Sequence, residues 1–539
     1  MKKVLFVFAF CFTILQIQAQ SFKVTFSELN SYTRFAQVID AGQVGSDLFV
    51  ILSNHKGGAV YLLNIYDQTN LRLKSSQIFK NTTCEGSNCI DKHFDYFKTM
   101  FLKDHVVMLF QTYERSGKNL QMYAQRVDQN GKFIGKLELI DEINSKSKSN
   151  AGSFMVWPSE DSTKFVIIDN PPFEKYNGEK FNFKIYDNEL KNKNNFGVSL
   201  PYKDKNLGVV DFFIGNDSKI HLLTLIQLER KQQKAGEARR FYSIFTINPD
   251  DQSVAEYKLD LPKRSVEDAS LKIDNKNKKF ICCGFYSDLK PRAKEGNDID
   301  GFYFMRVDIA TKKVEAQGTK EIDKDMVAEL INKKKVKDEQ GIAKTFVIKE
   351  IEPHTDGSIT LVTENRRDEI VTTTHCNNNG GCYTSTNYYY YRDNIFLINV
   401  AANGSVNSFI DVPKMQLSVN DGGKYLSFLN FKKDERMIFI YNDNPLNLNT
   451  KVKTIKDVKR MSYIRGAIAV AAEVNKDGSY NKIKLFENSY KNIALLPENG
   501  IKIGNGQYIV PTMVPPSACS CSCFGIFIKA KLGIAKIEL

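Results

Sequence analysis

Carboxylates, amides and an arginine stand at the ends of a series of short apolar segments along this chain. The candidate ligand-binding residues of this kind are Glu114, Asp169, Asn170, Glu229, Arg230, Asp288, Glu364, Asn442 and Asp443. If they converge at one place, such groups could bind the hydroxyls of a sugar or a hard cation such as calcium. Asp and Asn also cap strands and open turns, so a purely structural role is the alternative.

A second group of candidates lies in the polar insertion 364–392. Its four consecutive tyrosines, Tyr388 to Tyr391, are followed by Arg392, and Arg367 stands earlier in the same insertion. Aromatic faces beside a cation suit glycan stacking or protein recognition. We therefore add Arg367 and Tyr389 to the candidates, although alternation along an extended segment would bury half of these tyrosines.

The chain contains ten cysteines, whose spacing suggests three different roles. Cys84 with Cys89, and Cys376 with Cys382, flank short loops and are predicted to form local disulfides. Cys282 and Cys283 lie in an apolar strand and are predicted to be small buried side chains. A further cluster, Cys519, Cys521 and Cys523, could hold a soft metal or act in redox chemistry, but a disulfide plus a remaining thiol is the favoured interpretation.

Catalytic motifs are absent from the sequence. The six histidines show no metal-binding spacing, and there is no nucleophile elbow, phosphate-binding glycine loop or zincin helix. The catalytic residues are therefore unknown, and no cofactor is expected apart from the calcium considered above. Carboxylates from different repeats could still form a catalytic pair, so a glycan-active hydrolase or lyase is the alternative to a non-catalytic binding or scaffold protein.

The first residues predict export. Lys2 and Lys3 precede an apolar run that ends at Ala19, so residues 1–19 are predicted to be a signal peptide, with the mature protein periplasmic, extracellular or on the cell surface. No later run is long enough to span a membrane. The formal charge of +13 is spread over the whole chain. We therefore expect protein or glycan partners of the envelope or exterior rather than nucleic acid, and leave the oligomeric state open.

The elements that must position these residues are short strands in a repeating unit. Residues 95–141 contain four apolar segments separated by turns, and the same pattern recurs along the chain. The third segment of successive units ends at Asp67, Asp128, Asp187, Asn248 and Asp308, roughly 60 residues apart each time. Four antiparallel strands per unit, repeated this often, predict blades around a central axis.

We therefore predict an all-β fold, a single β-propeller over residues 20–539 with eight blades, seven being the alternative. Residues 22–29 form an unpaired strand, and the eighth unit lacks its fourth strand. Pairing residues 22–29 beside 532–539 would close the ring and remove both sheet edges. Residues 323–344 interrupt the strand pattern and are predicted to be a helical insertion.

Family resemblance is limited to the β-propeller superfamily. The run from Phe439 to Pro445, together with Val474 to Gly478, resembles uncharacterised exported propeller-like proteins. That resemblance implies the fold and no activity.

The lengths of the connections give the clearest functional prediction. Long insertions join the second strand to the third or one unit to the next, whereas the other turns are short. In an up-and-down blade these two long classes share one face, so we expect binding on that face. Drift in loop length without any function is the alternative.

Overall fold

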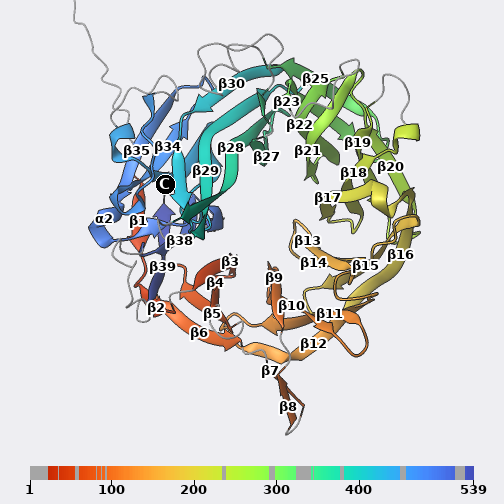
Figure 1. The fold of residues 1–539 in the computed structure, drawn as a ribbon, viewed down its shortest axis with the longest axis horizontal. Coiled ribbons are helices and arrows are strands. Elements are labelled where there is room, and N and C mark those ends of the chain that lie inside the picture. Colours follow the sequence, from red (N-terminus) through yellow and green to blue (C-terminus); the bar gives the residue numbers. More distant parts are fainter. Residues whose placement is uncertain are drawn as a thin grey trace, which may run out of the picture.

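The structure is a computed structural model that describes residues 22–33, 36–54, 60–79, 82–85, 88–91, 94–232, 238–289, 298–322, 342–343, 345–376, 382–448, 457–504, 506–515 and 529–538. Eight antiparallel sheets stand around a common axis, which confirms the eight-bladed propeller (Figure 1). The predicted signal peptide, the span 323–341 and the Cys519–Cys523 cluster lie outside the described residues. At the end of the predicted helical insertion, Ile342–Ala343 form a short strand, β26, paired with β23 (Asp298–Ile299).

The first four blades follow the chain in order. Blade 1 consists of β3 (Gln37–Val44), β4 (Asp47–Asn54), β5 (Val60–Asp67) and β6 (Leu73–Phe79). Blade 2 consists of β9 (Asp95–Phe101), β10 (Val106–Glu114), β11 (Asn119–Val127) and β12 (Phe133–Asn144). Blade 3 consists of β13 (Ser153–Pro158), β14 (Lys164–Asn170), β15 (Gly178–Asp187) and β16 (Asn192–Lys203). Blade 4 consists of β17 (Leu207–Ile214), β18 (Ile220–Gln227), β19 (Arg240–Ile247) and β20 (Val254–Leu259).

The next three blades carry the longer insertions. Blade 5 consists of β21 (Arg264–Asp274), β22 (Lys279–Asp288), β24 (Gly301–Asp308) and β25 (Val314–Glu321). Blade 6 consists of β27 (Phe346–Pro353), β28 (Ile359–Cys376), β29 (Cys382–Val400) and β30 (Val406–Val412), with β31 (Gln416–Val419) added beside β29. Blade 7 consists of β32 (Leu429–Lys433), β33 (Arg436–Asp443), β34 (Ile468–Val474) and β35 (Tyr480–Glu487). Short helices in the connections are η1 (Asp204–Asn206), η2 (Arg230–Gln232), η3 (Pro445–Asn447), η5 (Ile464–Gly466) and α2 (Asn488–Lys491).

Blade 8 closes the ring with strands from both ends of the chain, as predicted. It contains β36 (Ala494–Leu495), η6 (Pro497–Asn499), β37 (Ile501–Lys502), β38 (Gln507–Met513) and β39 (Ala530–Glu538). The outermost strand is β1 (Lys23–Phe26), which pairs with β39 from Lys23 opposite Glu538 to Phe26 opposite Ala535. A further short strand, β2 (Asn30–Tyr32), pairs with the start of β39.

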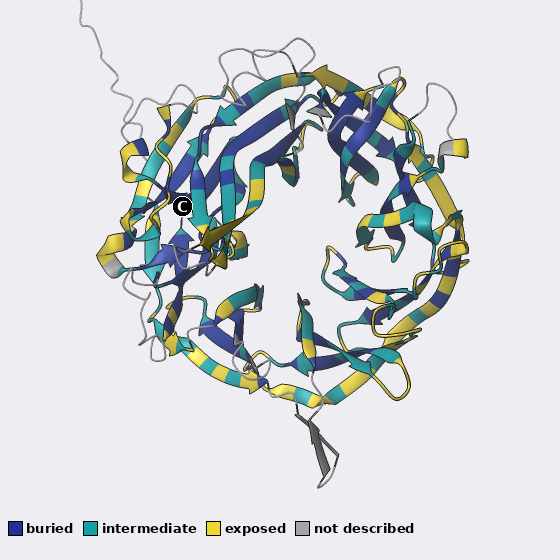
Figure 2. Ribbon diagram, in the orientation of Figure 1, coloured by how far each residue is buried: buried dark blue, intermediate teal, exposed yellow. Residues whose placement is uncertain are grey.

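The core lies between blades and explains the strand pattern. In β4, Phe49 and Ile51 pack toward blade 2, whereas Leu48, Val50 and Leu52 pack toward blade 8. Both faces of a middle strand are therefore covered, which requires a continuous apolar run. Outer strands such as β16 alternate between buried and exposed residues, and Figure 2 shows this alternation around the rim.

The residues that end the third strands have a structural role. Asp67, Asp128 and Asp187 each accept hydrogen bonds from backbone N–H groups of the following turn, at 2.8–3.0 Å. Aspartates that bond to nearby backbone in this way favour tight turns. Their regular spacing therefore marks the turn between the third and fourth strands of these blades.

Cysteine positions agree with the prediction where they are described. Cys282 and Cys283 are buried and face opposite sides of β22, in two different core clusters. Cys376 and Cys382 form a disulfide. In the short hairpin of β7 (Thr82–Glu85) and β8 (Asn88–Asp91), Cys84 stands opposite Cys89. That register suits the second predicted disulfide, although the two side chains lie outside the description.

Candidate functional site

The two faces of the ring differ in their connections. The turn face carries the turns between first and second strands and between third and fourth strands. The loop face carries the connections between second and third strands and between blades. The described turns on the turn face are short, as at Lys433–Arg436 between β32 and β33. The largest described elaboration, in blade 6, is on the loop face.

The first strand of each blade lies nearest the axis, and the second strand lies one position further out (Figure 1). The ends of the second strands are therefore separated from the axis by the first strands. A β-bulge recurs in the first strands, at Asp40, Asp211 and Asp268. Each of these carboxylates accepts a hydrogen bond from the next backbone N–H, at 2.8–2.9 Å.

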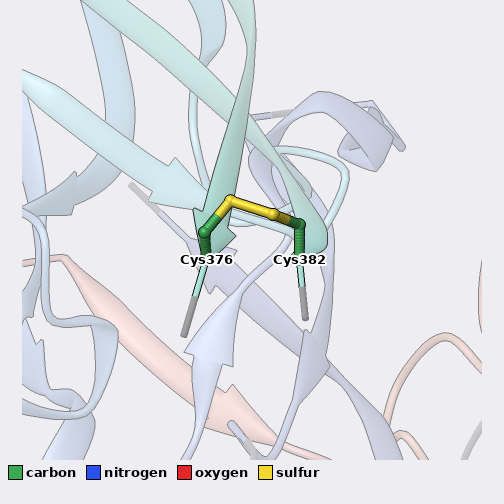
Figure 3. Close-up of a disulfide and its surroundings, with 2 residues drawn as sticks. All are labelled: Cys376 and Cys382. Carbon is green, nitrogen blue, oxygen red and sulfur yellow. A yellow bond between two sulfur atoms is a disulfide. The ribbon is translucent and has the colours of Figure 1, made fainter. Parts of the chain in front are cut away.

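The predicted insertion 364–392 is an extended β-hairpin. Residues 366–376 of β28 and 382–392 of β29, here called the arm, continue the blade in unbroken register from Arg366 opposite Arg392 to Cys376 opposite Cys382. At about 3.3 Å per residue the arm reaches roughly 35 Å from the blade. The disulfide between Cys376 and Cys382 joins the two strands at the tip, where the Cα atoms are 4.1 Å apart (Figure 3).

The arm is mostly exposed along its outer half (Figure 2). Ile370 is 69% exposed, Tyr383 67% and Tyr388 45%. Nearer the base, Tyr390 packs against the loops of blade 7. Both predicted candidates of this insertion, Arg367 and Tyr389, lie in the arm. The Arg367 guanidinium lies over the ring of Tyr391 at 4.3 Å and pairs with Glu369 at 2.9 Å. Tyr389 is half-buried on the neighbouring strand.

A buried polar network supports the base of the arm. The Lys414 ammonium, fully buried, donates to Glu364 at 2.8 Å, to the Arg392 carbonyl at 2.9 Å and to Gln416 at 3.0 Å. The second carboxylate oxygen of Glu364 accepts from Ser427 at 2.8 Å. All three ammonium protons are therefore used, as a buried cation requires. Burial lowers the pKa of Lys414, and the adjacent Glu364 carboxylate opposes that shift.

The same network includes Asn442. Its carbonyl accepts from the Gln416 amide at 2.7 Å, and its side-chain amide donates to the Tyr425 and Leu495 carbonyls at 2.8 and 3.0 Å. Next to it, buried Asp443 pairs with Lys482 at 3.0 Å and accepts from Asn447 at 2.7 Å. Glu364, Asn442 and Asp443 thus lie close together, but with their hydrogen bonds directed into the protein.

The other predicted residues are dispersed around the ring. Glu114 closes its own turn by accepting from the Gly117 N–H at 2.7 Å. Glu229 pairs with Lys205 at 2.9 Å, and this hydrogen bond, together with the charges of the nearby lysines, lowers the pKa of its carboxyl to about 2. Asp288 pairs with Arg264 at 3.3 Å. Asn170 borders a cavity described below, and the side chain of Arg230 lies outside the description.

Asp169 belongs to a buried acidic pair between blades 2 and 3. Its carboxyl lies beside that of Asp141, which also pairs with Lys184. Burial first, and then Asp141, raises the pKa of Asp169 far above its ordinary value. Asp169 Oδ1 and Asp141 Oδ2 have no hydrogen-bond partner among the described atoms. A proton shared between the two carboxyls would satisfy both oxygens.

A second acidic pair borders a loop-face cavity of about 290 Å³. Burial, together with the charge and the hydrogen bond of Asp204, raises the pKa of Glu179 to about 8. The two carboxyls are in hydrogen-bonding contact, closer than the ~5–9.5 Å between the carboxyls of most glycoside hydrolases. Their arrangement therefore does not match the predicted glycan-cleaving pair.

Within the described ranges, no three His, Cys, Asp or Glu side chains converge as metal ligands. None of the helices in the same ranges is long and apolar enough to cross a membrane.

Sequence reasoning missed Lys414, Gln416 and Ser427, because nothing in their spacing shows that they surround Glu364. It also missed the bulged aspartates, for which a signal exists. Each ends a Val-x-Asp triplet in a first strand, at 38–40, 209–211 and 266–268. A further signal for a hairpin was that segments rich in β-branched residues and tyrosines lie on either side of Cys376 and Cys382.

No protein-family model matches the chain, and no curated protein matches it. Solved structures share only the general fold. An uncharacterized protein from Listeria monocytogenes is 10% identical with a TM-score of 0.34, covering 78% of this chain and 92% of its own. The β-propeller domain of the Trilobed protease from Pyrococcus furiosus is 13% identical with a TM-score of 0.32, covering 83% and 98%.

A quinohemoprotein alcohol dehydrogenase from Pseudomonas putida is 11% identical with a TM-score of 0.39, covering 94% of this chain and 76% of its own. The chain is similar to these proteins as a β-propeller, and the likeness concerns the fold alone.

Proposed function

We propose that this protein is an exported, non-catalytic binding propeller whose loop face docks a protein partner through the arm. One observation carries the proposal. Exposed large apolar side chains gather on the arm and on the loops beside it, at Ile370, Val371, Tyr383, Tyr388, Val419, Leu446 and Tyr463. None of the exposed large apolar side chains found among the described residues lies in a turn of the turn face.

The edge of β28 favours a partner that presents an extended segment. β27 pairs with β28 only as far as Asn365, so beyond this residue β28 has a single neighbouring strand, β29, among the described strands. The outer backbone groups of residues 367–376 can therefore accept an added strand. The exposed side chains of Ile370, Tyr383 and Tyr388 would supply the apolar contacts. The disulfide at the exposed tip supports an oxidising location.

The test is a pull-down from the native envelope fraction, followed by affinity measurement with the purified partner. We expect the triple variant Ile370→Ser, Tyr383→Ser, Tyr388→Ser to weaken binding at least tenfold. The matched control replaces three exposed apolar residues of the rim, Ile78→Ser, Val254→Ser and Val314→Ser, and should leave affinity unchanged. Loss of binding in the control set, with full binding by the arm variant, would contradict the proposal.

A further inference from the structure

A second cavity lies on the opposite face of the ring, between blades 6 and 7. Its volume is about 300 Å³, the lower end of the range for small-molecule sites. It is surrounded by residues in and beside the turns of the turn face from both blades, including His354, Lys432 and Asn475. Neither the arm nor the buried network at its base contributes to it.

One wall of the cavity is a row of polar side chains directly opposite one another on three strands of blade 6. Thr360 stands opposite Asn399, and Asn399 opposite Ser408. Thr360 donates to Asn399 Oδ1 at 2.7 Å, and Asn399 Nδ2 donates to Ser408 Oγ at 3.0 Å. At the other end His354 Nε2 lies 2.9 Å from Thr360 Oγ1, and His354 Nδ1 contacts the Lys432 ammonium.

The row has a fixed hydrogen-bond direction. An ammonium can only donate, so His354 Nδ1 accepts from Lys432 and Nε2–H donates to Thr360. Burial, and then the charge of Lys432, lowers the pKa of His354, which keeps the imidazole neutral in this role. The direction continues through Thr360 and Asn399 to Ser408. The Ser408 hydroxyl proton then has no acceptor among the described residues, and Lys432 has two further N–H groups.

The charged groups that line the cavity are two lysines, Lys432 and Lys476, and two carboxylates, Asp356 and Glu435. Lys476 is already paired with Glu435, and the carboxylate of Asp356 accepts from Ser358. Lys432 is the one lining cation without a carboxylate partner in the described structure. The remaining lining is largely aliphatic and includes Leu397, Val400, Ile410, Met437 and Val474.

We propose that this cavity binds a small organic carboxylate, whose oxygens accept from Lys432 and Ser408 and whose aliphatic part lies on the apolar wall. This site is independent of the protein-docking role of the loop face.

The experiment titrates the full chain with butanoate, with butanamide as a neutral probe of the same shape and with inorganic phosphate. Binding is followed by calorimetry and by ligand-observed NMR. We expect butanoate to bind with Kd of about 1 mM or tighter. Both butanamide and phosphate should bind at least tenfold more weakly, because one lacks the charge and the other lacks an aliphatic part.

Lys432→Met should weaken butanoate binding at least tenfold and Ser408→Ala severalfold, whereas Lys433→Met, outside the cavity, should have no effect. If Lys432→Met does not fold, Lys432→Arg and Ser408→Ala decide the question. Equal affinity for butanoate and butanamide, no binding of butanoate at tens of millimolar, or affinity that both cavity variants leave unchanged would each overturn the proposal.

Discussion

At the scale of single residues, the buried pair of Lys414 and Glu364 is expected to matter for stability. Lys414→Met removes the cation that, among the described residues, pairs with this fully buried carboxylate. We expect a loss of about 3–5 kcal/mol in the free energy of unfolding, since removing one partner strands the other charge. Chemical denaturation measures it.

The control for this variant is Lys146→Met, which breaks an exposed pair with Glu174. That pair should contribute at most about 1 kcal/mol. Similar losses in the two variants would show that the network around Lys414 does not hold the base of the arm.

The acidic pair of Asp169 and Asp141 predicts a pH dependence. The pKa of Asp169 is raised in the folded state, so between its unfolded and folded pKa values the folded protein binds more protons, and stability falls as pH rises through that window. Asp169→Asn removes this titration and can donate to Asp141. Its melting temperature relative to the wild type should rise by a few degrees between pH 5 and pH 8. A constant difference over that range would contradict the shared proton.

The predicted candidate residues show that a sequence does not reveal the hydrogen-bond partners of a polar side chain. Asn442 and Asp443 end β33, as predicted, whereas Glu364 lies inside β28, where the arm begins. Their residue types suit a ligand and a structural network equally well. Their partners come from other connections: Lys414 from the segment after β30, and Lys482 from β35. Only the packing of blades 6 and 7 shows that these polar groups are satisfied within the protein.

At the scale of elements, the arm should be able to open locally. Beyond the base its residues have few buried contacts, so its stability is separate from that of the ring. Replacing both Cys376 and Cys382 with serine should leave the melting temperature of the ring nearly unchanged. Hydrogen exchange of residues 370–376 and 383–388 should accelerate at least tenfold.

Residues 220–227, the buried strand β18, provide the internal control for exchange in the same experiment. Acceleration there, or protection of the arm equal to that of the oxidised protein, would contradict local opening.

The arm also marks a limit of sequence reasoning. Residues 364–392 were predicted as a loop because their polar composition hides the strand pattern, which here has no buried face to impose alternation.

At the scale of the whole molecule, closure depends on β1. Phe26 packs against Phe486 with ring centroids 5.0 Å apart, and Val24 joins the same cluster. Phe26→Ala should cost about 2–3 kcal/mol, less than a fully buried phenylalanine because Phe26 is partly exposed. Phe173→Ala, at an exposed loop position, should cost less than about 0.5 kcal/mol. Equal melting temperatures for the two variants would mean that the stability of the ring does not depend on the packing of β1.

The ring itself was the most predictable feature. Blade count and closure follow from a period that eight sheets repeat, from the unpaired strand 22–29 and from an eighth unit that lacks its fourth strand. The two faces follow from up-and-down connectivity. The cavity between blades 6 and 7 could not be predicted. Ser408 of blade 6 and Lys432 of blade 7 line it together, and the repeat period does not show which residues of neighbouring blades face each other.

The register of the closing strands also determines how the ring responds to force. Lys23, at the start of β1, stands opposite Glu538, at the end of β39. Tension applied at these two ends would load the hydrogen bonds between the strands one pair at a time, as in a zipper, rather than all together in shear. The pairing of β1 with β39 should therefore separate at a low force when the protein is pulled at its termini. Tension along the strands of one blade would load several hydrogen bonds at once and should need a higher force.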